Sequence, residues 1–191
     1  SSVFSFAKAN NFEETLFYKH FKSFEALASE IFKLFFDNTQ AILNQSEEYK
    51  THDSRTKLLS FYYTFFENLT ANRSYVVFAL SNKRNYLKSL KPLHKLKKSF
   101  KGYIKNLDIN IVVSNVDSLE RLQDCGLQSL AWLQLLTTIK FWLNDTSSSF
   151  EKTDIFIEKS VNASFDLIDT TAVKSVIDLG KFLFKEKTCK N

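Results

Sequence analysis

Hydrophobic residues recur every three or four positions along most of the chain, and short polar runs separate these stretches. This spacing is typical of amphipathic helices rather than of strands. The polar segments 45–52, 81–86 and 144–149 are predicted to be loops, and the β-branched segment 108–115 is predicted to be an extended connection. Helices are predicted over 2–9, 12–20, 23–44, 53–70, 73–80, 91–107, 117–143 and 148–187, the last with a break at 169–170.

Residues suited to helix ends mark several of these boundaries. Asn10 and Asn11 separate the first two helices, since Asn tolerates the left-handed backbone conformation of a tight turn. Ser23 is a good N-cap for the long helix that follows it, and Pro92 fits the first turn of a helix. N-terminal capping pairs are predicted at three helix starts: Asn11 with Glu14, Asp117 with Glu120, and Ser148 with Glu151.

The composition agrees with a helical chain. Only three glycines and one proline occur among 191 residues. So few turn-forming residues argue against a β-sandwich, a β-barrel or a propeller, and the sequence therefore predicts an all-α fold. The 20 phenylalanines need a dry interior. A chain of this length buries roughly 70% of its unfolded surface, which is enough to provide one.

The helix at 117–143 is more apolar than one buried face requires, with ten apolar residues between Leu130 and Leu143. A second subunit covering the other face would explain this excess. The helices 117–143 and 148–187 of each chain would then form a four-helix dimer interface. The alternative is a central helix that is buried within one subunit.

Few features of the sequence indicate catalysis, a cofactor or a membrane. Cys125 and Cys189 have no metal-ligand spacing and are too few for a disulfide framework. His20, His52 and His94 lie on separate segments and belong to no metal, phosphate-loop or nucleophile motif. The chain has no stretch of about 18 uncharged apolar residues and no recognisable signal peptide. We therefore expect a non-enzymatic, cytoplasmic protein with no cofactor, metal site or membrane contact.

Residues 2–27 hold the most specific pattern in the chain. Two helices too short to be stable alone are joined by a tight turn and followed by a long helix, which is the layout of a helix-turn-helix DNA reader. Ala7, the Asn10-Asn11 turn, Phe12 and the run at 17–27 (FYKHFKSFEAL) closely resemble the TetR family of bacterial transcription regulators.

The resemblance implies a TetR-like, all-α fold and a homodimer formed through the last two long helices. It divides the chain into an incomplete helix-turn-helix head at 1–22 and a helical ligand-binding and dimerisation domain at 23–191. It also implies operator DNA as a partner, with repression as the commoner mode of regulation in the family.

The matched residues take the roles that the family gives them. Ala7 would let the two short helices cross closely, and Phe12, Phe17 and Phe21 would anchor the recognition helix. Thr15, Leu16 and Lys19 would face the major groove. Tyr18, His20 and Lys22 would contact backbone phosphates.

The head departs from the family pattern in two respects. The family's first helix has no counterpart in these residues, and Glu13 and Glu14 open the recognition helix where a small polar residue is usual. In residues 1–25 three lysines meet three glutamates, so the head lacks the positive charge that drives sequence-neutral DNA affinity. The alternative is therefore a TetR-derived, non-enzymatic interaction protein that has lost operator binding.

Basic charge is concentrated instead at 83–105, which holds nine basic residues and no acidic one. Apolar residues recur there at helical spacing, which predicts an amphipathic helix with a solvated lysine face. An acidic partner, DNA and an anionic membrane surface are the sharper interpretations. In the implied fold this segment lies away from the DNA-reading helices, and it is not assigned to the operator.

The implied ligand domain offers a candidate site for a small apolar ligand, whose binding would shift the DNA-reading heads. Few charged residues interrupt the aromatic faces that would form it. The alternative is that these rings simply fill the core. The candidate lining residues are Phe61, Tyr62, Phe65 and Phe66, with Trp132 and Leu136 opposite.

Overall fold

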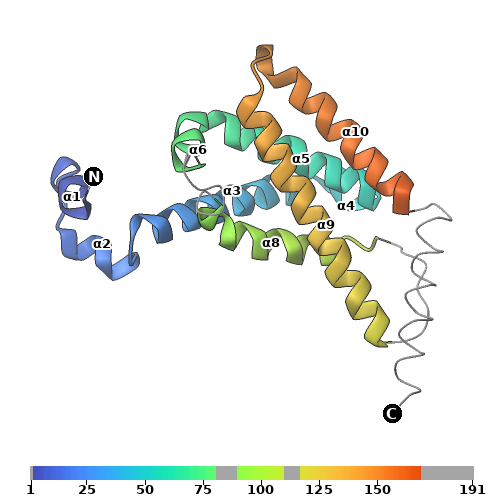
Figure 1. Cartoon of the computed structure of the whole chain (residues 1–191), viewed down its shortest axis with the longest axis horizontal. Coiled ribbons are helices and arrows are strands. Elements are labelled where there is room, and N and C mark those ends of the chain that lie inside the picture. Colours follow the sequence, from blue (N-terminus) through green and yellow to red (C-terminus); the bar gives the residue numbers. More distant parts are fainter. Residues whose placement is uncertain (1, 81–89, 110–116, 169–191) are drawn as a thin grey trace. The chain divides into compact units, whose positions relative to one another are not determined.

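The computed structural model describes residues 2–80, 90–109 and 117–168, and within the last range it describes the side chains from 126 onward. These residues form nine α-helices and two short 3-10 helices and contain no strand, so the all-α prediction is confirmed (Figure 1). In chain order the elements are α1 (Val3–Ala9), α2 (Glu14–His20), α3 (Phe24–Asn44), α4 (Glu47–Thr51), α5 (Ser54–Ala71), α6 (Arg73–Leu80), η1 (Lys91–Leu93), α8 (His94–Lys105), α9 (Asp117–Asn144), η2 (Ser148–Phe150) and α10 (Glu151–Ile168).

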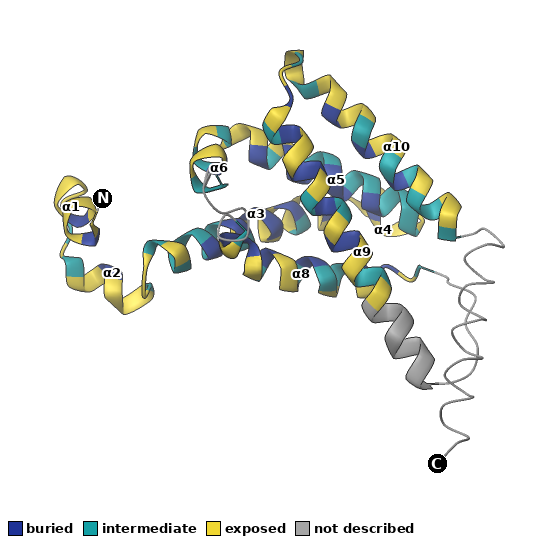
Figure 2. Ribbon diagram, viewed as in Figure 1, coloured by how far each residue is buried: buried dark blue, intermediate teal, exposed yellow. Residues whose placement is uncertain are grey.

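The chain divides into two compact units. The first comprises Ser1–Gln45 and Thr64–Phe100, and the second comprises Ser46–Tyr63 and Lys101–Asn191. Helices α5 and α8 each contribute residues to both units. Buried positions are frequent on α3, α5, α8 and α9 (Figure 2).

The helical spacing located most elements closely. Helices α1, α2, α3, α5, α6 and α9 begin and end within two residues of the predicted limits, and the predicted 91–107 helix is η1 followed by α8. The predicted loop at 81–86 and the break at 169–170 lie outside the described residues. The same holds for most of the predicted extended segment and for the predicted last helix beyond Ile168.

The prediction of a loop at 45–52 was wrong, because this segment contains α4. Its polar sequence concealed two helix-forming features. The Ser46 hydroxyl accepts a hydrogen bond from the Tyr49 backbone N–H at 3.2 Å, which caps the helix. Tyr49 is buried, and this one apolar contact is enough to hold the short helix against the rest of its unit.

In the first unit, α3 is tied to its neighbours by both rings and hydrogen bonds. The Thr39 hydroxyl donates to the Phe35 carbonyl at 2.8 Å and accepts from Asn68 Nδ2 on α5 at 3.0 Å. Phe32 lies 6.2 Å from the ring of Tyr75 on α6. A buried hydroxyl with both partners satisfied fixes the register of α3 against α5 without an unpaired polar group.

Helix α3 also receives η1 and the start of α8. Ser29 Oγ and His94 Nδ1 share a hydrogen bond of 2.8 Å, and Lys95 pairs with Glu30. Pro92 lies within η1, as expected of a residue suited to a first helical turn. The start of α8 is therefore fixed to the first two turns of α3.

In the second unit, Tyr103 of α8 joins α4 and α5. Its ring stacks on Phe61 with a centroid distance of 4.8 Å. Its hydroxyl donates to the Lys57 carbonyl at 3.1 Å and accepts from the Tyr49 hydroxyl at 3.0 Å. Burial raises the pKa of Tyr103, so it stays a neutral donor in this arrangement.

Asp145 closes the turn between α9 and α10. Its Oδ1 accepts hydrogen bonds from the Ser147 backbone N–H and hydroxyl at 2.8 and 2.6 Å. Its Oδ2 accepts from the Thr153 backbone N–H and hydroxyl at 2.9 and 2.7 Å. The predicted capping pair of Ser148 with Glu151 was wrong, because this buried carboxylate caps the start of α10 from outside the helix.

Replacing Asp145 by Asn is expected to lower the unfolding temperature at neutral pH, because the charge-assisted hydrogen bonds weaken. The Ser147 hydroxyl and Thr153 hold the pKa of Asp145 far below its usual range. The ionised form therefore stabilises the fold above the unfolded pKa of about 4, and this contribution is lost as the pH falls toward the folded-state pKa. Thermal unfolding of wild type and Asp145→Asn is measured at about pH 7, 5 and 3. The difference between their unfolding temperatures should become smaller only at the acidic end of this range.

Glu151→Gln is the matched control for this prediction, since Glu151 is exposed and was the capping residue that the sequence suggested. Its unfolding temperature should stay close to that of wild type. A gap for Asp145→Asn that is absent at neutral pH, or that does not change with pH, would contradict the role assigned to the carboxylate.

Candidate functional site

The turn between α1 and α2 reverses the chain within four residues. Asn11 adopts φ 55°, in the left-handed region that Asn tolerates, as predicted. The Phe12 backbone N–H returns to the Ala7 carbonyl at 3.1 Å, and Asn10 Nδ2 donates to the Phe6 carbonyl at 2.9 Å. The predicted capping pair of Asn11 with Glu14 was wrong, because Glu13 is the N-cap of α2 and makes no side-chain capping bond.

Phenylalanine rings fill the space inside the head. Phe17 of α2 is 5% exposed and lies 5.6 Å from the ring of Phe21 and 5.4 Å from that of Phe24. Phe6 of α1 lies 5.5 Å from both Phe12 and Phe24. These edge and tilted contacts link α1, α2 and the start of α3. The three expected anchors, Phe12, Phe17 and Phe21, are therefore buried or half-buried in one cluster.

Two small features complete the head. Ala7 is 2% exposed, so its methyl group leaves room for α1 to approach α2, as predicted. The Ser23 hydroxyl accepts from the Ala26 backbone N–H at 3.2 Å and caps α3, also as predicted. The head thus passes directly into the long helix behind it.

The six residues expected to meet DNA share one property, which is exposure to solvent. Leu16 and Tyr18 keep 46% and 54% of their surface in water although both are large apolar side chains. Leu16 and Tyr18 share α2 with the exposed side chains of Lys19 and His20. The six residues are Thr15, Leu16, Tyr18, Lys19, His20 and Lys22.

The six residues expected to line a ligand pocket are more enclosed. Phe61 and Tyr62 are fully buried, and the face of Phe61 is covered by Tyr103. Burial raises the pKa of Tyr62. Phe65 and Phe66 are buried as well, with ring centroids 5.9 Å apart. Trp132 is 9% exposed and Leu136 is half-buried on α9. Their role as a ligand site stays a prediction.

The second unit has a cavity of about 410 Å³ that α9 and α10 line together with Leu58 and Ile104. Most of its wall is apolar, and Gln134, Thr137, Ser160 and Ser164 supply the polar side chains. Gln134 Nε2 donates to Ser160 Oγ at 3.3 Å, and Ser164 Oγ donates to Gln134 Oε1 at 3.4 Å. None of the six predicted residues lines this cavity. On α9 the cavity is lined by the side that carries Leu130 and Gln134 and not by the side that carries Trp132 and Leu136.

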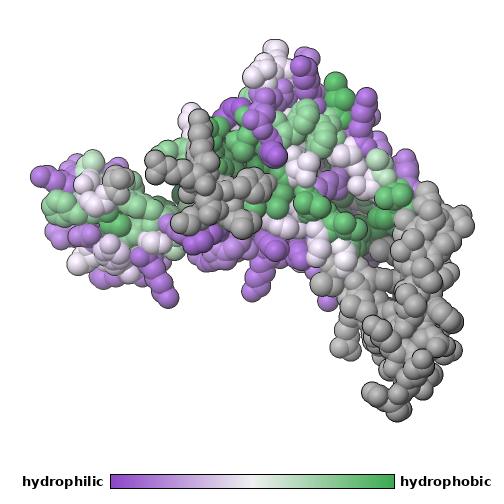
Figure 3. Space-filling model, viewed as in Figure 1, coloured by the Kyte–Doolittle hydropathy of each residue, from purple (hydrophilic) through white to green (hydrophobic). Residues whose placement is uncertain are grey.

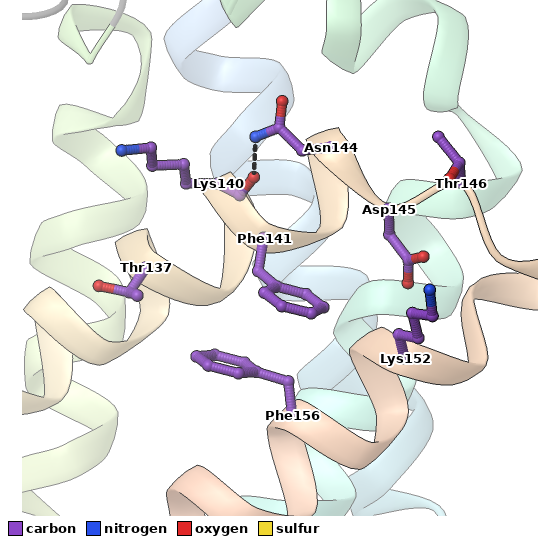
Figure 4. Close-up of a pocket in the computed structure, with 8 residues that line it drawn as sticks. All are labelled: Thr137, Lys140, Phe141, Asn144, Asp145, Thr146, Lys152 and Phe156. Carbon is purple, nitrogen blue, oxygen red and sulfur yellow. Dashed lines mark hydrogen bonds between the residues drawn. The ribbon is translucent and has the colours of Figure 1, made fainter.

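A second cavity, of about 420 Å³, lies where α9 meets the turn before α10 (Figure 4). Phe141 and Phe156 stack across it with centroids 4.6 Å apart and planes 7° from parallel. Lys140, Lys152 and Asp145 also line it. This cavity is more polar than the first, and its stacked rings join the two helices.

Helices α9 and α10 expose many apolar side chains (Figure 3). On α9 the opposite face is buried and includes Leu135, Ile139 and Trp142, so this helix has apolar residues on more than its buried face, as its sequence indicated. The exposed fractions on the two helices are Leu130 68%, Leu133 58%, Phe141 37%, Ile155 49% and Leu167 59%.

The described residues offer little for catalysis. No group of three His, Cys, Asp or Glu side chains among them lies close enough to hold a metal ion. The Cys125 side chain and Cys189 lie outside the described residues. In the part of the chain that the structure describes, no helix has the length and apolarity needed to span a membrane.

Comparison with known families shows what part of the chain is similar to a described family. A family model described as "Tetracyclin repressor-like, C-terminal domain" matches residues 57–183. The matched range covers most of α5 and all elements after it, and it excludes the head. No curated protein matches the chain.

Replacing Phe17 by Ala is expected to open the head while leaving the long helices folded. Removal of a buried phenylalanine costs about 3–5 kcal/mol, so amide hydrogen exchange in α1 and α2 should accelerate by roughly 100-fold or more. Leu16→Ala, at the exposed neighbouring position, should leave exchange in both helices nearly unchanged. Equal exchange rates in Phe17→Ala and wild type would show that the rings do not hold the head together.

Proposed function

This chain belongs to the TetR family, and we propose that it is a DNA-binding transcriptional regulator that acts as a repressor and is released by a small apolar ligand. Membership of the family suggests a transcriptional regulator. Regulators of this family are typically non-enzymatic, and no catalytic function is proposed.

The observation that carries the proposal is the geometry of the head. Its second helix, α2, turns Phe17 inward to the ring cluster and leaves five of the six proposed contact residues in solvent, and Lys22 is exposed just beyond the helix. A rigid helix with an exposed face of mixed apolar and polar side chains suits the major groove, where it can meet base edges and flanking phosphates. The family match does not extend to the head, so the head supplies support independent of it.

We propose a homodimer that uses α9 and α10. Two helices from each chain would bury the exposed leucines, isoleucine and phenylalanine of these helices in a four-helix interface. A two-fold dimer would also place two heads on two half-sites of a palindromic operator.

For the ligand, the aromatic set that includes Phe61 and Trp132 remains the proposed site. The cavity of about 410 Å³ between α9 and α10 supports a ligand in the same helical domain, since its volume fits a small molecule. Its apolar wall favours a largely apolar compound, and Gln134 offers one hydrogen-bonding group.

Selection from a random DNA pool at about 100 mM salt is expected to recover a palindrome, with half-site centres about 10 base pairs or a multiple of that apart. The double variant Tyr18→Ala, Lys22→Ala should bind the recovered duplex at least about tenfold more weakly, because it loses two contacts to phosphates. It should still form dimers.

The matched control is Phe78→Ala, Lys50→Ala, which removes an exposed ring from α6 and an exposed lysine from α4. It should bind like wild type. No enrichment by folded, dimeric protein would overturn operator binding by the unliganded protein. The zero net charge of the head would then favour a TetR-derived interaction protein.

Placing charges on α9 tests the dimer. The double variant Leu130→Glu, Leu133→Glu is expected to raise the dimer dissociation constant by at least about 30-fold, which corresponds to about 2 kcal/mol. Sedimentation equilibrium measures the change. Leu34→Glu, at a 53% exposed position on α3, should leave the dimer intact. Unchanged association of the α9 variant would place the interface elsewhere.

A further inference from the structure

We propose that Lys97 and Lys98 of α8 form a second phosphate-contacting surface beside the head, so that this chain holds DNA with a helix outside its helix-turn-helix. The proposal rests on the proposed function, since it assumes that DNA is the partner. It assigns to α8 the positive charge that the head lacks.

The start of α8 contacts the first two turns of α3, the helix that directly follows the head. Helix α2 ends at His20 and α3 begins at Phe24. Lys91 Nζ lies 3.7 Å from Glu25 Oε1, in the first turn of α3. Together with the Ser29–His94 hydrogen bond and the Lys95–Glu30 pair, this contact fixes α8 to the first two turns of α3. The head, this part of α3 and α8 up to Phe100 all belong to the first unit.

This arrangement revises the interpretation of the basic segment. The sequence placed 83–105 away from the DNA-reading helices, whereas residues 91–95 contact the helix that directly follows them. Residues 83–89 lie outside the described part of the chain. The revision therefore concerns η1 and α8 alone.

The two ion pairs change the charge near the head. Glu25 and Glu30 would repel a phosphate backbone that passes the start of α3. Lys91 and Lys95 cancel these two carboxylates. Residues 1–25 sum to zero only when Glu25 is counted, so they carry a net charge of +1 once Glu25 is paired with Lys91. Lys97 and Lys98 of α8 add two further positive charges to the same unit.

Lys97 and Lys98 are the side chains available for this contact. Both are exposed, and no carboxylate among the described residues pairs with either. They follow His94 by three and four residues, so all three lie on one exposed side of α8. Leu96 and Phe100 are fully buried on the other side and hold the helix in place. Hydrophilic side chains cover the surface of the molecule along α8 (Figure 3).

The composition of this face favours a phosphate backbone over other anionic partners. Insertion into a membrane interface needs exposed apolar side chains beside the basic ones, and a protein partner needs buried anchors such as aromatic residues. The exposed residues of α8 offer neither. Lysine ammonium groups act as point charges, and they therefore suit an array of phosphates. The exposed residues are His94, Lys97, Lys98, Gly102 and Lys105.

Salt dependence measures the number of phosphates that the protein neutralises. The logarithm of the DNA association constant falls linearly with the logarithm of the salt concentration, and each lost phosphate contact makes this slope less steep by about 0.9. The double variant Lys97→Gln, Lys98→Gln should therefore have a slope that is less steep by about 1.8, and it should bind at least about tenfold more weakly at about 100 mM salt. The loss should be equal for a duplex carrying the selected palindrome and for a scrambled duplex of the same length, because phosphates carry no sequence information.

Two control variants accompany this measurement by fluorescence anisotropy. Lys50→Gln, Lys57→Gln removes the same charge from α4 and α5, outside the proposed dimer helices, and should keep the wild-type slope. Lys97→Arg, Lys98→Arg keeps the charge and should also keep the slope. Surface substitutions of this kind change stability little, and thermal unfolding of each variant verifies it.

The outcomes separate this proposal from the proposed function. If the wild type binds DNA and Lys22→Gln weakens binding, but Lys97→Gln, Lys98→Gln keeps the wild-type slope, α8 does not contact phosphates and the regulator proposal stands. If the wild type binds neither duplex, the proposed function fails and this inference fails with it. If the α8 variant keeps its DNA slope but loses binding to vesicles of phosphatidylserine and phosphatidylcholine, the surface belongs to a membrane.

Discussion

Packing of phenylalanine rings is the interaction on which the head depends. Helices α1 and α2 have seven residues each, too few to form without tertiary contacts. Phe17 of α2 meets the rings of Phe6 on α1 and Phe24 on α3, and Phe6 also meets Phe12 after the turn and Phe24. The exposed face of α2 has a fixed shape only because its opposite face is held in this way. Any recognition of DNA by this chain therefore begins with an apolar cluster that never touches DNA.

The aromatic cluster and the exposed lysines of the first unit lie on different elements. The head has rings and a balanced set of charges, whereas the lysines lie on α8, which α3 brings to the same unit. Shape and electrostatic attraction can thus come from two separate elements that share one support. Helix α3 serves both, because its first turns follow the head directly and bind η1 and α8 through Glu25, Ser29 and Glu30.

The elements with strong helical spacing were predictable from the sequence, and so was the left-handed turn at Asn11. Helix α4 was missed because a single buried tyrosine in a polar segment leaves no periodic signal. The capping pairs at Glu14 and Glu151 were misassigned, because a three-residue spacing does not reveal that Asp145 can cap a helix from eight positions upstream. The cavity of the second unit follows Leu130 and Gln134. The sequence directed attention to the neighbouring aromatic face, because apolar residues are not confined to one side of α9 and its orientation could not be predicted from them. The exposure of the six head residues followed from the family pattern rather than from periodicity.

The Asp145 turn also bears on the order in which the chain folds. Its hydrogen bonds join residues eight positions apart, so little chain entropy is lost when the turn closes. The hydroxyl contact between Tyr49 and Tyr103, by comparison, spans 54 positions. Contacts of short sequence separation form faster than distant ones. The α9–α10 hairpin is therefore suited to form early, before the distant parts of its own unit have assembled. Its apolar outer face would be exposed during that interval, so the hairpin that we propose as the dimer interface is also where unfinished chains are most prone to associate.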